Sequence, residues 1–155
     1  MQLTASEDIE APLDRVFAAV TDFEGIERQA LRRGVDVRRV DSIAGPASGM
    51  TWQAAFGFRG KPRKTEVCLS EYHPPEQLVF DSVTGGLEAR FILDLVALSR
   101  GRTRLNVSTQ LKPTTLSSRL LVQSMKLAKG GIDKRFRHRM AALAKDLENR
   151  VKHGG

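Results

Sequence analysis

The chain has 155 residues, is 41% hydrophobic and carries a net charge of +7, which is typical of one globular domain. No stretch approaches the roughly 20 consecutive apolar residues of a membrane-spanning helix, which excludes that class of protein. Residues 1–10 lack the basic start and apolar block of a secretory signal, and the single cysteine, Cys68, excludes an internal disulfide. We therefore expect one domain over residues 1–155, in a reducing cytoplasm.

The first third of the chain predicts a strand and two short helices. Residues 2–10 alternate loosely between polar and apolar and predict the strand. Ala11–Pro12 favours the start of a helix, because proline suits the first helical turn. Asp22–Arg33 predicts a second short helix, and Gly34 is suited to end it, since glycine tolerates the left-handed conformation found at helix ends.

Six further strands are predicted, with glycine or proline between most of them. They cover residues 35–43, 50–58, 64–70, 77–83, 87–98 and 103–111. Apolar and polar side chains alternate along several of these segments, which predicts a sheet with one covered face. The short turns predict antiparallel pairing. The expected class is therefore α+β, with a curved antiparallel sheet covered by helices.

The last segment, Leu116–Val151, predicts one long amphipathic helix. Its apolar stripe recurs every three or four residues and comprises Leu121, Met125, Ala128, Ile132, Phe136, Met140, Leu143, Leu147 and Val151. Gly130–Gly131 interrupts the helix, and each glycine costs about 1 kcal/mol there relative to alanine. We expect a bend or break at this pair, with a mobile part near a pocket entrance before it. Leu116, Leu120 and Leu127 lie off the stripe and favour the same conclusion.

The charge excess lies entirely on the C-terminal segment. Residues 116–155 contain 10 Lys or Arg and 3 Asp or Glu, whereas the charges of residues 1–115 cancel. One interpretation is a surface for anionic membrane lipids or nucleic acid; the other is the solvated back of an amphipathic helix. Few aromatic residues and no recognisable nucleic-acid motif argue against a nucleic-acid partner.

Three local motifs fall in an order that resembles the START-like superfamily. Residues 9–23 (IEAPLDRVFAAVTDF) resemble its usual opening, in which a strand runs into Ala-Pro and a short helix. Residues 72–80 (YHPPEQLVF) are similar to its hairpin with paired prolines, and residues 101–105 (GRTRL) to the entry of its last strand. The superfamily includes the polyketide cyclase/dehydrase and lipid-transport (SRPBCC) proteins and the birch pollen allergen.

This resemblance implies a helix-grip fold of order βααββββββα. In such a fold a curved seven-stranded antiparallel sheet surrounds the C-terminal helix, and a cavity lies between them. Some members carry lipids or hormones, some cyclise or dehydrate polyketides, and some are co-chaperone domains. The fold alone does not choose among these functions.

Strand parity predicts which side chains face the cavity. From the strands these are Trp52, Phe56, Val67, Leu69, Phe80, Phe91, Leu93, Val107 and Thr109, and from the helix Met125, Ile132, Phe136 and Met140. Ligand pockets are mostly apolar with a few polar groups, so this set is a candidate ligand site. For each residue, ordinary core packing is the alternative.

Glu71 and His73 are the candidate catalytic residues. They continue the inward parity of Val67 and Leu69, so at the cavity rim they could orient a ligand or act as acid and base. The alternative is that the strand ends there and both are solvated. The three histidines lack metal-ligand spacing, and we expect neither a metal nor another cofactor.

These observations lead to three hypotheses about function. The first is binding or carriage of a hydrophobic small molecule or lipid in the cavity, and we favour it over an enzyme. The second is a polyketide cyclase/dehydrase-type enzyme that uses Glu71 and His73 in the same cavity. The third is weak contact of the basic C-terminal helix with an anionic membrane or another partner.

Overall fold

The computed structural model describes residues 1–58 and 60–154 and contains seven strands and four helices. In chain order these are β1 (Gln2–Ile9), α1 (Leu13–Val20), α2 (Phe23–Arg32), β2 (Asp36–Arg39), β3 (Thr51–Phe58), β4 (Lys61–His73), β5 (Gln77–Thr84), β6 (Leu87–Ser99), β7 (Arg102–Pro113), α3 (Leu116–Leu127) and α4 (Lys129–Gly154). The predicted order is confirmed up to the C-terminal segment, where two helices replace the expected one.

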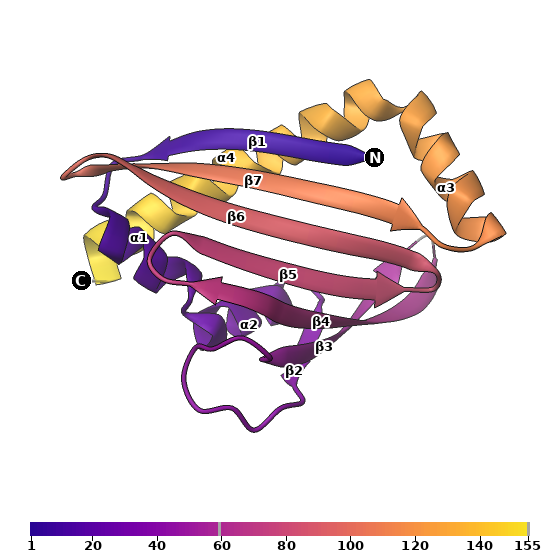
Figure 1. Cartoon of the computed structure of the whole chain (residues 1–155), viewed down its shortest axis with the longest axis horizontal. Coiled ribbons are helices and arrows are strands. Elements are labelled where there is room, and N and C mark those ends of the chain that lie inside the picture. The colour runs from indigo at the N-terminus through magenta and orange to yellow at the C-terminus, as the bar shows by residue number, and fades with distance from the viewer. Residues whose placement is uncertain (59, 155) are drawn as a thin grey trace.

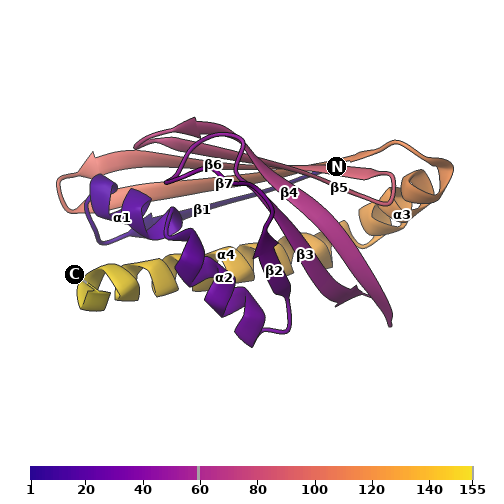
Figure 2. The same ribbon diagram turned by 90° about the horizontal axis from the view of Figure 1, so that it is seen from below.

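All seven strands form one antiparallel sheet, in the order β1-β7-β6-β5-β4-β3-β2 (Figure 1). Strands β2 to β7 follow one another as a meander, and β1 closes the far edge by pairing with β7 from Gln2 opposite Gln110 to Ile9 opposite Thr103. Helices α1, α2 and α4 lie on one side of the sheet, and β3 and β4 bend toward them (Figure 2). We call the covered side the inner face and the opposite side the outer face. This arrangement confirms the predicted helix-grip fold.

The core forms where alternate strand residues meet the apolar faces of α1 and α4. Its most deeply buried members include Ile9, Val16, Leu69, Leu78, Leu105 and Leu147, each at most 1% exposed. Along β6 and β7 the buried residues stand at every second position, because successive side chains point to opposite faces. On α4, Ala144 and Leu147 stand three residues apart and therefore share one face of the helix.

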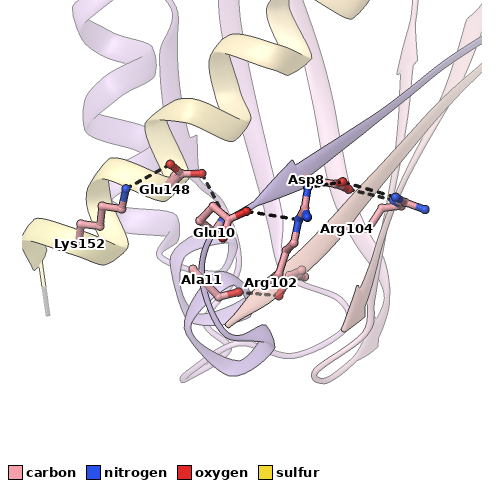
Figure 3. A network of polar contacts seen from close by, with 8 residues as sticks. Asp8, Glu10, Ala11, Arg102, Arg104, Glu148 and Lys152 are labelled. Carbon is pink, nitrogen blue, oxygen red and sulfur yellow. Dashed lines mark hydrogen bonds and ion pairs between the residues drawn. The ribbon is translucent and has the colours of Figure 1, made fainter. Parts of the chain in front are cut away.

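A polar network fixes the C-terminal part of α4 against the end of β1 (Figure 3). The Glu148 carboxylate accepts a 3.0 Å hydrogen bond from the Glu10 backbone N–H and pairs with Lys152 at 3.3 Å. Arg104 pairs with Asp8 at 2.9 Å, so the start of β7 is held to β1 as well. The Glu10 amide, followed by Lys152, holds the pKa of Glu148 below its ordinary value. The network helps keep α4 across the inner face.

The expected interruption of the last helix is present, but it lies slightly before the glycine pair. Helix α3 ends at Leu127 with Ala128 as its cap, and Gly130–Gly131 falls in the first turn of α4. A capping box between Thr115 and Ser118 starts α3 separately. Helix α3 extends beyond the end of the sheet and makes a sharp angle with α4 (Figure 1). The prediction of one long helix is therefore wrong, and the prediction of a break is confirmed.

Candidate functional site

A cavity of about 440 Å³ opens between α2, the inner face of the sheet and the C-terminal half of α4. Its lining comprises Val20, Ile26, Gln29, Ala30, Arg33, Val35, Leu78, Phe80, Phe91, Leu93, Leu143, Leu147 and Arg150. Leu78 faces Leu93 and Phe80 faces Phe91 across the β5–β6 pair, so these four side chains form the floor. We call this space the grip cavity. It is mainly apolar.

A second, smaller hollow of about 180 Å³ adjoins the grip cavity and shares Ile26 and Phe80 with it. Its other lining residues are Phe23, Glu27, Val37, Trp52, Ala54 and Val67. The rings of Phe23 and Trp52 pack edge-on with centroids 5.0 Å apart, and Trp52 Nε1 donates to the Glu27 carboxylate at 3.1 Å. The aromatic cluster continues from Trp52 to Phe80 at 6.3 Å, which links the two hollows.

Three polar side chains meet the grip cavity: Gln29, Arg33 and Arg150. Gln29 donates to Asp146 at 3.5 Å, and Arg150 lies 3.5 Å from Asp22. These contacts are long and partly exposed, so they hold the two side chains only loosely. The arrangement therefore offers an apolar interior with hydrogen-bond donors near α2 and the end of α4.

The predicted ligand-binding residues are divided between the two hollows and the core. Phe80, Phe91 and Leu93 line the grip cavity, and Trp52 and Val67 line the smaller hollow. Leu69 and Val107 are buried in the core, and Phe136 and Met140 pack against it. The remaining predicted residues are partly buried and line neither hollow: Phe56, Thr109, Met125 and Ile132. Helix α3, which carries Met125, joins the start of α4 (Figure 1), whereas the grip cavity meets α4 only from Leu143 onward, so α3 is not its entrance.

Sequence reasoning missed the contribution of α2 and of the end of α4. The α2 residues of the lining follow one another at spacings of three and four, so they share one face of the helix and its cap. They are Ile26, Gln29, Ala30 and the cap residue Arg33. That spacing was visible in the sequence. Which face of α2 meets the cavity depends on how the helix crosses the sheet, and the spacing does not determine this.

The predicted placement of Glu71 and His73 at the cavity rim is wrong. The β4–β5 pairing shifts by one residue between Leu69, opposite Phe80, and Glu71, opposite Val79. Such a bulge reverses the side-chain parity beyond it. Glu71 and His73 therefore lie on the outer face, where they contact each other at 3.2 Å with side chains 44% and 59% exposed. Tyr72 turns inward instead, and its ring packs 5.8 Å from that of Phe17.

A larger groove of about 710 Å³ lies outside the sheet–helix interface, between α1 and the end of α4. Its lining includes the charged side chains of Asp14, Arg15, Asp22 and Arg150. Charged groups keep water bound and disfavour an apolar ligand. The smaller grip cavity is for this reason the better candidate ligand site.

Asp41 organises the β2–β3 loop beside the aromatic cluster. Its carboxylate accepts hydrogen bonds from Arg39 Nε at 2.7 Å, the Thr51 amide at 2.7 Å and the Ile43 amide at 2.8 Å. Arg39 in turn lies over the Trp52 ring, 5.6 Å from its centroid. The Arg39 guanidinium, followed by the Thr51 amide, holds the pKa of Asp41 well below its ordinary value.

We expect Asp41→Asn to destabilise the protein above about pH 4 and to lose this effect at lower pH. A carboxylate whose pKa is lowered by folding stabilises the folded state above its unfolded pKa of about 3.9. That stabilisation disappears as the pH falls toward the folded pKa. Urea denaturation of both proteins between pH 7 and about 2.5 measures the difference. A difference that stays constant over this range would show that the Asp41 carboxylate does not hold the loop.

Within the described residues, no group of three His, Cys, Asp or Glu side chains is placed to hold a metal ion. The same residues include no helix that is both long enough and apolar enough to cross a bilayer.

The fold recurs in solved structures of low sequence identity. The Zhui aromatase/cyclase from Streptomyces sp. R1128 is 11% identical to this chain and superposes with a TM-score of 0.74. The alignment covers 100% of this chain and 98% of the Zhui chain. The protein TTHA0849 from Thermus thermophilus is 19% identical, with coverage of 100% and 99% and a TM-score of 0.65. A START superfamily protein from Mycobacterium smegmatis is 16% identical, with coverage of 99% of both chains and a TM-score of 0.63.

No curated protein matches this sequence closely enough to count as a relative. The family described as polyketide cyclase/dehydrase and lipid transport, in contrast, matches residues 1–148. This match agrees with the helix-grip architecture and confirms the resemblance to the START-like superfamily. The chain belongs to the polyketide cyclase/dehydrase and lipid-transport family.

Proposed function

We propose that the protein binds or carries a hydrophobic small molecule or lipid in the grip cavity. The observation that supports this most directly is the apolar hollow of about 440 Å³ between α2, the inner face and α4. Pockets for small molecules typically measure about 300–1,000 Å³ and are lined mainly by apolar and aromatic side chains. The adjoining hollow of about 180 Å³ extends the room available along the aromatic cluster.

Gln29, Arg33 and Arg150 suit the polar end of such a ligand. Gln29 offers a side-chain amide, and the two arginines offer cationic hydrogen-bond donors. All three side chains stand on the side of the cavity formed by α2 and the end of α4. Donors at one side of an apolar pocket fix the orientation of an amphipathic molecule. The ligand that fits best therefore has an apolar body and one polar group.

The cyclase/dehydrase alternative is less well supported. It requires an acid–base pair that reaches the ligand, and geometry decides such candidates before pKa does. Glu71 and His73 lie on the outer face, across the sheet from the grip cavity. That alternative therefore loses the pair of residues on which it was based.

Mass spectrometry of the purified 155-residue chain tests the proposal. Organic extraction and native spectra should reveal a bound apolar molecule, or else anilinonaphthalene sulfonate should bind saturably to the folded protein and be displaced by fatty acids. A folded protein with no bound molecule, no saturable dye site and no displacement would overturn the proposal.

A further inference from the structure

Helix α3 presents three leucines to solvent at one end of the molecule. Leu116, Leu120 and Leu127 are 73%, 57% and 93% exposed. Leu120 and Leu127 follow Leu116 by four and eleven residues. On a helix with 3.6 residues per turn, all three therefore point within about 40° of one another. We call them the leucine stripe. Single exposed leucines are common in soluble proteins, but three on one face of one helix form an apolar surface.

The opposite side of α3 is anchored to the body of the protein. Val122 and Ser118 are 3% and 4% exposed and lie on the side of the helix away from the leucine stripe. Thr114, just before the helix, donates from its amide to the Gly86 carbonyl at 2.8 Å, which ties the start of α3 to the β5–β6 turn. The stripe is therefore held outward by the fold, at the end of the molecule where α3 extends beyond the sheet (Figure 2).

Cationic side chains flank the leucine stripe without acidic neighbours in sequence. Arg119 and Lys126 are exposed on α3, and Asp133 is the only acidic residue between positions 116 and 145. Asp133 pairs with Lys129 at 3.6 Å. Among the described residues, neither Arg119 nor Lys126 takes part in an ion pair. Their charges remain available to an anionic partner.

We propose that α3 docks the protein on an anionic membrane surface. The leucine stripe enters the boundary between headgroups and acyl chains, and Arg119 and Lys126 contact the anionic headgroups. Interfacial helices combine these two features, an apolar face and basic residues beside it. The cationic flank matches an anionic bilayer in charge, and a fluid surface accepts a protruding helix without a preformed groove. The total charge of the C-terminal segment does not single out one part of it for membrane contact, whereas the leucine stripe singles out α3.

Docking through α3 is separate from ligand binding in the grip cavity. The cavity residues of α4 begin at Leu143, fifteen residues beyond the break at Ala128. At 1.5 Å per residue this is about 22 Å along the helix axis. Changes to α3 are therefore expected to leave the dye affinity of the grip cavity unchanged, and the two proposals can fail independently.

Co-sedimentation of the full chain with vesicles tests the docking surface. The vesicles contain phosphatidylcholine alone or phosphatidylcholine mixed with phosphatidylserine. The triple variant L116Q/L120Q/L127Q removes the apolar contact, and R119Q/K126Q removes the charge contact. The matched controls are L31Q/V83Q/V96Q, which changes three exposed apolar residues elsewhere, and R28Q/R32Q, which changes two cations of α2.

We expect the wild type to bind the mixed vesicles and to bind phosphatidylcholine alone at least about tenfold more weakly. Each α3 variant should lower the partition onto mixed vesicles by at least about tenfold, and both controls should match the wild type. All the leucines changed are exposed, and thermal melts confirm that the variants fold. Equal binding by wild type and α3 variants, or no preference for phosphatidylserine, would overturn the proposal. The proposal would also be overturned if the wild type were a dimer that does not bind vesicles and if L116Q/L120Q/L127Q were monomeric. Helix α3 would then be an interface between two copies of the chain.

Discussion

Leu147→Ala is expected to lower the free energy of unfolding by about 3 kcal/mol. Leu147 lies on α4, is 1% exposed and belongs to the core formed with the inner face of the sheet. Truncating a fully buried leucine loses its apolar burial and leaves a space that the surroundings fill only partly, at a cost of roughly 2–5 kcal/mol. Urea denaturation should show a lower midpoint with an unchanged slope.

Leu127→Ala provides the matched control for this measurement. Leu127 also belongs to the C-terminal segment, but it is 93% exposed at the end of α3. Its truncation should change the free energy of unfolding by less than about 0.5 kcal/mol. A small effect at both positions would contradict the packing of α4 against the sheet.

Ala30→Trp is expected to weaken the binding of an apolar ligand by more than about tenfold. Ala30 lies on α2 and lines the grip cavity, so an indole ring at this position occupies space that the ligand needs. A tenfold loss of affinity corresponds to about 1.4 kcal/mol of binding free energy. Replacing apolar contacts by a steric clash is expected to cost more than this. The substitution should cost only about 0.5 kcal/mol in helix propensity, so the protein remains folded.

Titration with anilinonaphthalene sulfonate measures this effect, with Ala18→Trp as the control. Ala18 lies on α1, is exposed and lines the groove between α1 and α4. The control should bind the dye as the wild type does. If Ala18→Trp blocked binding and Ala30→Trp did not, the ligand site would be the α1–α4 groove.

The alternation of the strands made the sheet predictable, but it did not locate every side chain. Trp52, Phe80 and Phe91 face inward as their alternation predicts, because strand parity is maintained wherever the pairing is regular. Glu71 and His73 do not, because one extra residue in β4 moves them to the outer face. A bulge depends on pairing with the neighbouring strand, and the sequence of β4 alone carries no clear signal of it.

The helices show a similar division between what is local and what depends on packing. Gly130–Gly131 indicated a weak point in the C-terminal segment, because glycine lowers helix propensity whatever its surroundings. The break occurs at Ala128, where α3 turns away from α4. The path of α3 and the side of α2 that meets the cavity depend on tertiary contacts, which periodicity does not encode.

Methyl-selective NMR of the full chain tests the grip cavity most directly. On titration with anilinonaphthalene sulfonate, the methyl resonances of Ile26, Leu78, Leu93 and Leu143 should shift together and saturate. Those of Val83 and Val96, which are exposed on the outer face, should stay in place. Saturable shifts at Val83 and Val96, with no change at the four cavity positions, would contradict a ligand site between the sheet and α4.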